Sequence, residues 1–462
     1  MYILSCAAVD PSEDGVNSWD TDDTERVAVP KPLTMLDLNE DCLNQIFESK
    51  YVSAMDLVSV TKSCSKLKRI STQIFTKKYN MCNFNDAGVK NLVMAENLLE
   101  TFGSLISGLC INFAPYGFDG SKIVDAILRF CENLNSLSMA SYEIPDTRDD
   151  ITKITLLFGK VEVLHINDVK IEWPDGCVVD DFVTPNAYVM DIFENCNSLI
   201  DLKIENCPTL ELVAFGNKFS QLEHIYYAYG GNDVGTGFLD DGYIPAFIMR
   251  HRKLKSLRLT EQMRNVQVLC MIPVYCKELE NLEFRTETNS DDRFFTFWLA
   301  SLAQLDRLRE LKIVWRGQRV TDMLKEFHRS KSLNVLHLES VKGGLDLLQS
   351  LAGIKTLRCV KLVDVELHPF GILTHITGLI EHKTGEIESS FDISKLVDGL
   401  PNLRKLKIHC KNYSLTESEY VRLADAVECR VGTDRYLQVD CNTTGDFTNS
   451  LRRSVQFKTF VQ

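Results

Sequence analysis

The sequence predicts an α/β solenoid, in which short parallel strands alternate with helices, preceded by a small all-helical unit. Two observations lead to this fold class. A short apolar string of the form L-x-x-L-x-L recurs through most of the 462 residues, and the segments before it carry apolar residues three and four positions apart. A third observation, the lack of this string in residues 33–78, sets the front of the chain apart as a separate unit.

The apolar string is clearest at residues 199–207, LIDLKIENC. Its last two apolar residues alternate with polar ones, so a strand would turn them to one side. Preceding segments such as IVDAILRF and TDMLKEF have the apolar spacing of a helix that covers a sheet. Since one such unit cannot bury its own core, we expect the units to stack into a curved array over residues 79–440. The strings begin at Ile106, Leu134, Val161, Leu199, Leu222, Leu254, Leu279, Leu308, Leu333, Leu357 and Leu403.

The spacing between strings is mostly that of such an array. The last interval, from Leu357 to Leu403, is the longest, and we interpret it as hiding a degenerate unit near Ile380. Loops at 167–190 and 229–243 are longer than the repeat requires and are candidates for binding. Residues 441–462 are predicted to be a C-terminal tail.

The composition excludes several classes of protein. A formal charge of −13 argues against nucleic-acid binding. The apolar start MYILSCAA has no basic flank, so we do not expect a signal peptide, and no apolar run is long enough for a membrane span. The 15 cysteines form no C-x-x-C pair, which favours free thiols in the cytoplasm or nucleus. Cys131, Cys196 and Cys276, each three residues before a repeat leucine, are predicted to be structural.

No catalytic or cofactor motif is present, including G-x-S-x-G, H-E-x-x-H, a P-loop and G-x-G-x-x-G. We therefore expect a protein that is not an enzyme and that binds no cofactor or metal.

The front of the chain has two parts. Residues 1–32 carry seven acidic and two basic side chains without an apolar period, which predicts disorder. Residues 33–78 predict three short helices, the first capped by Asn39. Their apolar residues are Leu36, Leu38, Leu43, Ile46 and Phe47, then Leu57, Val60, Cys64, Leu67 and Ile70, and finally Ile74 and Phe75.

The repeats resemble the leucine-rich-repeat family in its longer, helix-containing form. The front unit looks like an F-box, which reads L-x-x-L-P-x-E-x-L-x-x-I-F-x-x-L and then D-L-x-x-V-x-x-V-C-x-x-W. Three departures from this pattern matter: Asn39 replaces proline, Lys50–Tyr51 replaces a leucine, and Leu67 replaces tryptophan. The alternative is an N-terminal cap on the solenoid. The matching residues are Leu38, Leu43, Ile46, Phe47, Asp56, Leu57, Val60 and Cys64.

The F-box resemblance implies a substrate receptor of a cullin–RING ubiquitin ligase, which docks on a Skp-family adaptor and through it on the cullin and RING subunits. Such a receptor acts by proximity and performs no bond chemistry. The alternative function is a non-ligase leucine-rich-repeat scaffold or a small-GTPase regulator. Some of the implied adaptor contacts must instead hold the helices together. These contacts are Leu36, Leu38, Leu43, Ile46, Phe47, Leu57 and Val60.

The substrate surface should be the open face of the strands, formed by the position between the last two apolar residues of each string. The later positions of this set are mostly basic, and Lys405 lies nearby. This favours an acidic or phosphorylated protein segment as the substrate. The alternative is that these are ordinary solvated strand residues. The predicted contacts are His224, Tyr226, Arg258, Lys312, His337, Lys361 and Lys407. The full set of positions is Cys110, Ser138, His165, Lys203, Tyr226, Arg258, Glu283, Lys312, His337, Lys361 and Lys407.

Overall fold

The structure is a computed structural model, and it describes residues from Thr34 to Thr459 with gaps. The predicted acidic segment 1–32, and nearly all of the predicted loops at 167–190 and 229–243, lie outside the described residues. The gaps are 116–118, 172–190, 208–209, 211–213, 229–242, 263–267, 287–296, 298–299, 316–319, 344, 368–396, 401, 410–416, 430–436 and 442–454.

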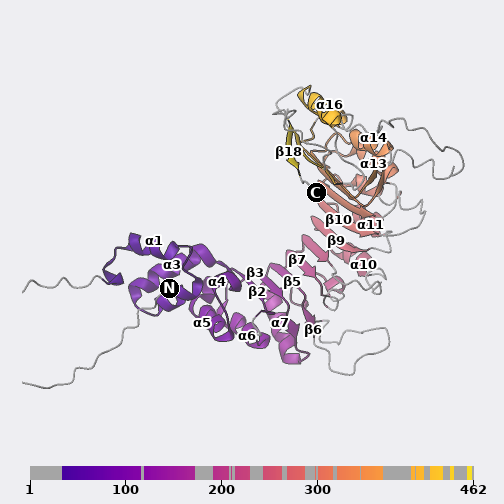
Figure 1. Cartoon of the computed structure of the whole chain (residues 1–462). Helices are drawn as coiled ribbons and strands as arrows, with labels where there is room; N and C mark the ends of the chain where they lie inside the picture. The colour runs from indigo at the N-terminus through magenta and orange to yellow at the C-terminus, as the bar shows by residue number, and fades with distance from the viewer. Residues whose placement is uncertain are drawn as a thin grey trace, which may run out of the picture.

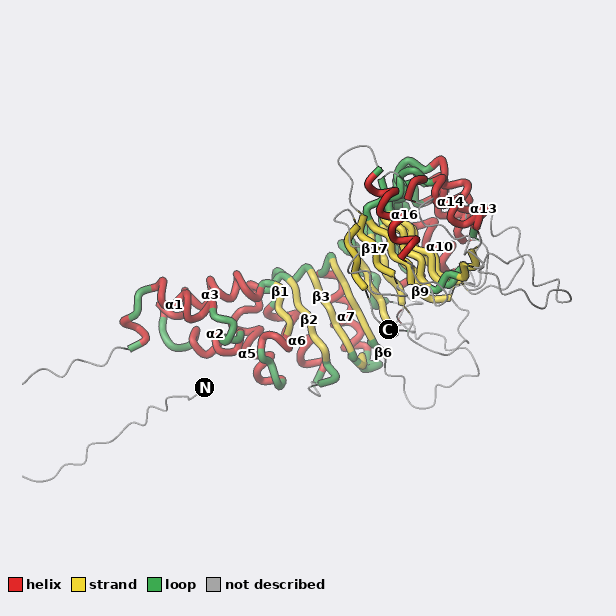
Figure 2. Tube along the Cα trace, turned by 45° about the horizontal axis from the view of Figure 1, so that its top comes forward, coloured by secondary structure: helices red, strands yellow, loops and turns green. Residues whose placement is uncertain are grey.

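One long parallel sheet runs through the described residues, with its fourteen strands in chain order (Figures 1 and 2). All eleven predicted strings form strands of this sheet, so the predicted parallel array is confirmed. The strands are β1 (Met81–Asn83), β2 (Gly108–Asn112), β3 (Ser136–Ala140), β5 (Val163–Asn167), β7 (Asp201–Glu205), β8 (His224–Ala228), β9 (Ser256–Gln262), β10 (Asn281–Thr286), β11 (Glu310–Trp315), β12 (Val335–Glu339), β14 (Cys359–Val363), β16 (Lys405–His409), β17 (Leu437–Cys441) and β18 (Val455–Thr459).

Helices cover one face of the sheet and leave the other face open (Figure 2). At the N-terminal end lie three helices, preceded by a short 3-10 turn (Figure 1). These are η1 (Met35–Asp37), α1 (Glu40–Glu48), α2 (Ala54–Thr61) and α3 (Ser65–Tyr79). The remaining helices are α4 (Phe84–Ala87), α5 (Leu92–Phe102), α6 (Gly120–Phe130), α7 (Arg148–Lys160), α10 (Tyr243–Arg250), α11 (Val268–Tyr275), α13 (Thr321–Glu326), α14 (Leu345–Gly353) and α16 (Glu417–Glu428). Further 3-10 turns are η2 (Gly103–Leu105), η4 (Leu302–Gln304) and η5 (Phe327–Arg329).

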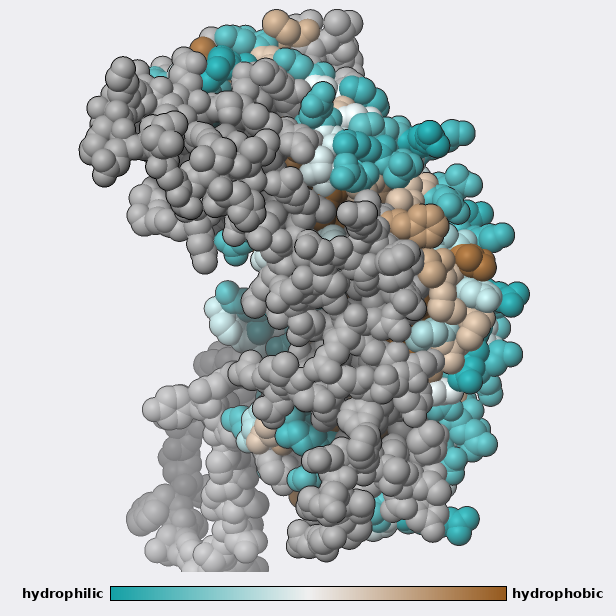
Figure 3. Space-filling model, turned by 90° about the vertical axis from the view of Figure 1, so that its right-hand side faces the viewer, coloured by the Kyte–Doolittle hydropathy of each residue, from teal (hydrophilic) through white to brown (hydrophobic). Residues whose placement is uncertain are grey.

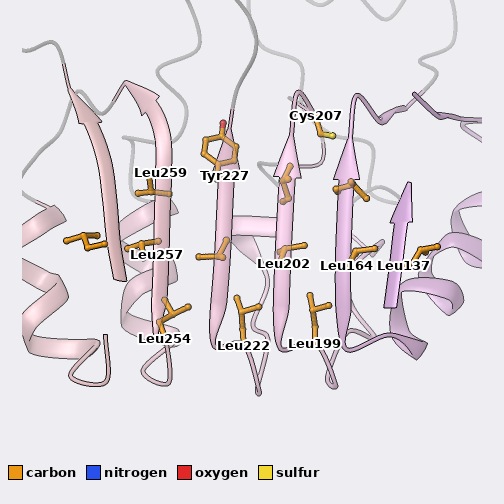
Figure 4. Packing of buried hydrophobic residues seen from close by; sticks show 14 of the residues in the cluster. Leu137, Leu164, Leu199, Leu202, Cys207, Leu222, Tyr227, Leu254, Leu257 and Leu259 are labelled. Carbon is orange, nitrogen blue, oxygen red and sulfur yellow. The ribbon is translucent and has the colours of Figure 1, made fainter. Parts of the chain in front are cut away.

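The core follows from the alternation in each strand. In β7, Leu202 and Ile204 are fully buried, while the residues between and around them are half-buried. Equivalent leucines of neighbouring strands lie level with one another and form continuous ladders (Figure 4). Each buried leucine side chain contributes about 1.5–3 kcal/mol, and stacking allows every repeat to bury its leucines against its neighbours.

Five strands end in a residue with left-handed backbone geometry, at φ between 48° and 59°. This geometry turns the chain sharply and keeps the backbone N–H aimed at the next repeat. The N–H of Asp168, for example, donates to the carbonyl of Glu205 at 2.8 Å. Asn, Asp and Ser tolerate the left-handed region through local side-chain hydrogen bonding. The five residues are Ser141, Asp168, Asn206, Ser340 and Asp364.

Two short parallel pairs flank the main sheet at these turns. They are β4 (Glu143–Ile144) with β6 (Lys170–Ile171), and β13 (Lys342–Gly343) with β15 (Glu366–Leu367).

The structure extends the predicted repeats at the C-terminal end. Strand β14 pairs directly with β16, with Lys361 opposite Lys407. The degenerate unit predicted near Ile380 lies outside the described residues. The sheet also continues through β17 into β18, which lies in the segment predicted to be a tail. Strand β18 was missed because its apolar residues do not keep the L-x-x-L-x-L spacing.

Candidate protein-binding surfaces

The N-terminal helices bury apolar side chains in a core that continues into the repeats. Leu43 and Phe47, one turn apart on α1, are buried together with Leu57 of α2 and Phe75 of α3. Helix α1 begins at the predicted cap, because the Asn39 side chain accepts a hydrogen bond from the N–H of Cys42 at 2.7 Å. Helix α2 begins with a capping box in which Ser53 and Asp56 bond each other's backbone N–H groups.

Ion pairs hold α1 alongside α3 in the same direction. Glu40 pairs with Arg69, and Glu48 pairs with Lys77 at 2.7 Å. The Nζ atom of Lys66 donates to the carbonyls of Leu36 and Leu38 at 3.0 and 2.9 Å, which fixes η1 against the start of α3. These contacts use one side of α1 and leave another side uncovered.

The structure sorts the predicted adaptor contacts into three groups. Leu43, Phe47 and Leu57 are buried, so they belong to the members of this set that hold the helices together. Leu38 and Val60 are partly buried against that core.

Leu36 and Ile46 are the predicted contacts that remain exposed, at 50% and 41%. Met35 and Tyr51 are also exposed, and sequence reasoning did not select them. Met35 stands at the first leucine position of the F-box pattern and Tyr51 follows its last one, but only burial could show that they face solvent.

The open face of the sheet places the predicted positions in one continuous row. Strand register brings Lys203 beside Tyr226, then Arg258, Glu283 and Lys312, and the same register continues in both directions. The row contains all eleven predicted positions, from Cys110 to Lys407, and each is half-buried. His224 lies two residues before Tyr226 on the same face of β8.

The middle of this row carries paired charges. Lys203 is 2.8 Å from Glu205 and lies over the Tyr226 ring at 5.2 Å. Lys312 pairs with Glu283 at 2.6 Å, and Lys255 pairs with Glu223 at 2.6 Å. Arg258 is 4.0 Å from Glu310. The centre of the open face is therefore polar and close to neutral.

The C-terminal end of the row is different. Within the described residues, the side chains of Lys361 and Lys405 form no ion pair or hydrogen bond. Burial, together with the positive charges of Lys312, Lys361 and Lys407, lowers the pKa of His337 to about 4. The His337 Nε2 atom is buried and has no hydrogen-bond partner in the described part of the chain, and a Glu339 oxygen lies 3.6 Å away.

The three cysteines predicted to be structural are buried at the turns that lead into strands. Burial raises the pKa of Cys131, Cys196 and Cys276 to about 12, which keeps each thiol neutral. Among the described residues no group of three or more His, Cys, Asp or Glu side chains could hold a metal ion.

The opposite, helical side of the molecule presents a largely hydrophilic surface with a smaller apolar area (Figure 3). Its exposed apolar side chains include Met249 of α10 and Val274 of α11. In the part of the chain that is described, no helix has the length and apolar character to cross a membrane.

No protein-family model and no curated protein matches the chain. Among solved structures, the chain is similar to an internalin from Listeria monocytogenes str. 4b F2365. The two share 16% identity over 73% of this chain and 83% of the internalin, with a TM-score of 0.40. The long parallel sheet of the chain is itself consistent with a leucine-rich-repeat solenoid, a protein-interaction fold.

Proposed function

We propose that this protein is a non-catalytic receptor with two binding surfaces, acting as the substrate-recognition subunit of a cullin–RING ubiquitin ligase. The helical unit binds a Skp-family adaptor, and the open face of the sheet binds the protein to be ubiquitinated. This role belongs in the cytoplasm or nucleus. The observation that carries the proposal is the exposed apolar set of Leu36 and Ile46, on a unit that already buries its own core.

The helical unit is also fixed to the first repeat. The rings of Phe75 and Phe102 stack with centroids 4.1 Å apart, and Lys62 Nζ donates to the Asn97 side-chain oxygen at 2.9 Å. These contacts support the cap interpretation, and the two roles are compatible. A cap contacts the repeats through the side of the helices that faces them. Leu36 and Ile46 are exposed and remain available for another partner.

Rigid attachment matters for a receptor that acts by proximity. Its contribution to ubiquitination is the effective concentration of a substrate lysine near the charged conjugating enzyme. A stiff connection between adaptor and substrate surfaces limits the volume that the lysine explores. The packed Phe75–Phe102 contact favours such a connection.

Adaptor capture tests the first surface. A Leu36→Asp, Ile46→Asp double variant should lose the adaptor in a pull-down, because both side chains would be anchors in an apolar interface. Val93→Asp is the matched control, since Val93 is 63% exposed on α5. Thermal melting should show that both variants remain folded. Failure of the wild-type chain to capture the adaptor would refute the ligase role.

The second candidate is a leucine-rich-repeat scaffold or small-GTPase regulator without a ligase. The docking of α3 on α5, which suits a simple cap, is the observation that favours it. A protein partner retained by the sheet, with no adaptor captured by the helical unit, would distinguish this candidate from the receptor.

A further inference from the structure

The outer surface of neighbouring helices carries apolar side chains at equivalent positions. Helices α10 and α11 pack side by side, and η4 packs beside α11. Met249 on α10 and Val274 on α11 are 41% and 59% exposed, and Ala303 on η4 is half-buried. We call Met249, Val274 and Ala303 the outer apolar patch. Each lies five residues before a repeat leucine, and these leucines are Leu254, Leu279 and Leu308.

The helices that carry this patch have almost no charge. Helix α11 contains no charged residue, and in α10 the last residue, Arg250, is the charged one. Helices α6 and α7, by contrast, carry charged side chains of both signs. Figure 3 shows an apolar area on this side of the molecule, bordered by hydrophilic side chains. An exposed apolar area of this kind is typical of a surface that binds a partner.

Four exposed cations lie at one end of the patch, in the last turn of α10 and in the turns that follow α10 and α11. Two of them contact backbone or amide oxygens: Arg250 donates to the carbonyl of Gly216 at 2.6 Å, and Lys253 donates to the Gln221 side chain at 2.8 Å. A third, Arg252, lies over the Tyr275 ring at 5.7 Å. We call these four cations the basic rim, and they are Arg250, Arg252, Lys253 and Lys277.

No carboxylate neutralises the basic rim within the described residues. Glu278, which follows Lys277 in the chain, is itself paired with Arg307 at 2.8 Å. Lys255, a little further along the chain, differs from the rim because it pairs with Glu223 at 2.6 Å. The end of the outer apolar patch is therefore positively charged, whereas the patch itself is neutral.

We infer that the outer apolar patch and the basic rim together bind an amphipathic helix of a partner protein, with acidic residues at one end of that helix. Apolar side chains three and four residues apart on such a helix form one stripe, which can lie along the patch. Helices α10 and α11 have eight residues each, or about 12 Å. About two turns of the partner helix would cover the patch, and its carboxylates would then meet the rim.

The chemistry of the rim favours carboxylates on a protein over an anionic lipid surface. The arginine guanidinium matches a carboxylate through two parallel hydrogen bonds, and Arg252 is held by no hydrogen bond in the described part of the chain. A lipid surface would meet the whole molecule, whose formal charge of −13 opposes binding to anionic headgroups. This binding goes beyond the proposed function, because the surface lies on the helical side of the sheet and not on its open face (Figure 2).

Binding of labelled helical peptides to the full chain tests the inference. The probes are two peptide pools about 15 residues long, or about 22 Å as a helix, with leucines fixed in one stripe. One pool carries glutamates at either end, and the other carries lysines at the same positions. Fluorescence anisotropy should show that the glutamate pool binds about tenfold more tightly at low salt, with a difference that shrinks as salt screens the rim.

Two variants separate the roles of the patch and the rim. Met249→Ser, Val274→Ser should lose binding of both pools, because the apolar anchors are removed. Arg252→Gln, Lys253→Gln, Lys277→Gln should still bind but should lose the preference for glutamate. Because all these side chains are exposed, thermal melts of both variants should match wild type.

Each variant has a matched control on another helix of the same side. Val93→Ser replaces a side chain that is 63% exposed on α5, and Arg129→Gln replaces an arginine that lies over Phe130 as Arg252 lies over Tyr275. Both controls should bind as wild type does. Equal binding of the two pools by wild type, binding of neither, or equal losses in variants and controls would overturn the inference.

Other occupants give different results. Sedimentation would detect a second copy, and flotation with phosphatidylserine vesicles would detect a lipid surface. Self-association or vesicle binding that Met249→Ser, Val274→Ser removes, without binding of the glutamate pool, would also overturn the inference. The assays contain no adaptor, so their outcome is independent of adaptor capture through Leu36 and Ile46.

Discussion

The Nε2 atom of His251 accepts a hydrogen bond of 2.9 Å from the backbone N–H of Phe219, which lies in the preceding repeat. Its Nδ1 atom is 2.7 Å from the carbonyl of Phe247, so Nδ1 carries the proton. The imidazole also stacks on the Phe247 ring, with centroids 3.9 Å apart. A neutral histidine therefore links two repeats inside the core.

This buried histidine predicts a loss of stability in acid. Burial lowers the pKa of His251 from 6.5 to about 4, so the unfolded chain binds a proton more readily than the folded chain. The stabilisation is complete above the unfolded pKa and is lost as the pH falls towards the folded value. Between pH 7.5 and 5 we expect His251 alone to remove about 2 kcal/mol from the free energy of unfolding.

Urea denaturation of wild type and His251→Leu at the two pH values measures this effect. At pH 7.5 the variant should be less stable by about 1–3 kcal/mol, since the buried N–H of Phe219 loses its acceptor. It should also lose less stability than wild type on acidification. The control is His224→Leu, on the open face of β8. Parallel pH profiles for wild type and His251→Leu would contradict the assignment.

The repeated part of the fold could be predicted because periodic spacing alone determines which residues of a strand are buried. The prediction of strands failed where this spacing is broken. At β1, Tyr79, Cys82 and Phe84 replace the usual leucines, and β18 lacks the regular string. The row from Cys110 to Lys407 could likewise be predicted from alternation. The pairing of Lys312 but not of Lys361 could not, because it depends on strand register and on the carboxylates of neighbouring strands.

The different burial of Leu57 and Ile46 predicts different losses of stability when each is replaced by alanine. Leu57 is fully buried, so Leu57→Ala should destabilise the unit by about 2–5 kcal/mol through lost contacts and a cavity. Ile46→Ala should change stability by about 0.5 kcal/mol or less, because the side chain is exposed. Limited proteolysis near residues 49–53, followed over increasing urea, compares the two. Equal sensitivity would mean that Ile46 belongs to the core.

The left-handed backbone after β5 restricts which side chains are tolerated at Asp168. Its φ of 51° is unfavourable for a β-branched side chain, so Asp168→Val should cost about 1–2 kcal/mol. Asp168→Gly removes the exposed pair with Lys170 at 3.1 Å but suits the left-handed backbone, and its stability should stay close to that of wild type. Thermal melts of both variants test this. If Gly and Val destabilise the protein equally, the lost carboxylate and not backbone geometry would be responsible.

The lysines around His337 predict a change in its pKa that needs no ligand. Burial is the main cause of the lowered value of about 4, and the charges of Lys312, Lys361 and Lys407 add to it. Lys361→Gln removes a positive charge that disfavours protonation of the nearby His337 imidazole. The pKa of His337 should therefore rise towards 6.5. NMR titration of the imidazole C–H signals, with His337 assigned through His337→Gln, measures the shift. Lys203→Gln should leave the His337 signal unchanged. If Lys361→Gln also leaves it unchanged, Lys361 does not act on His337, and the convergence of charge at this end of the sheet would be refuted.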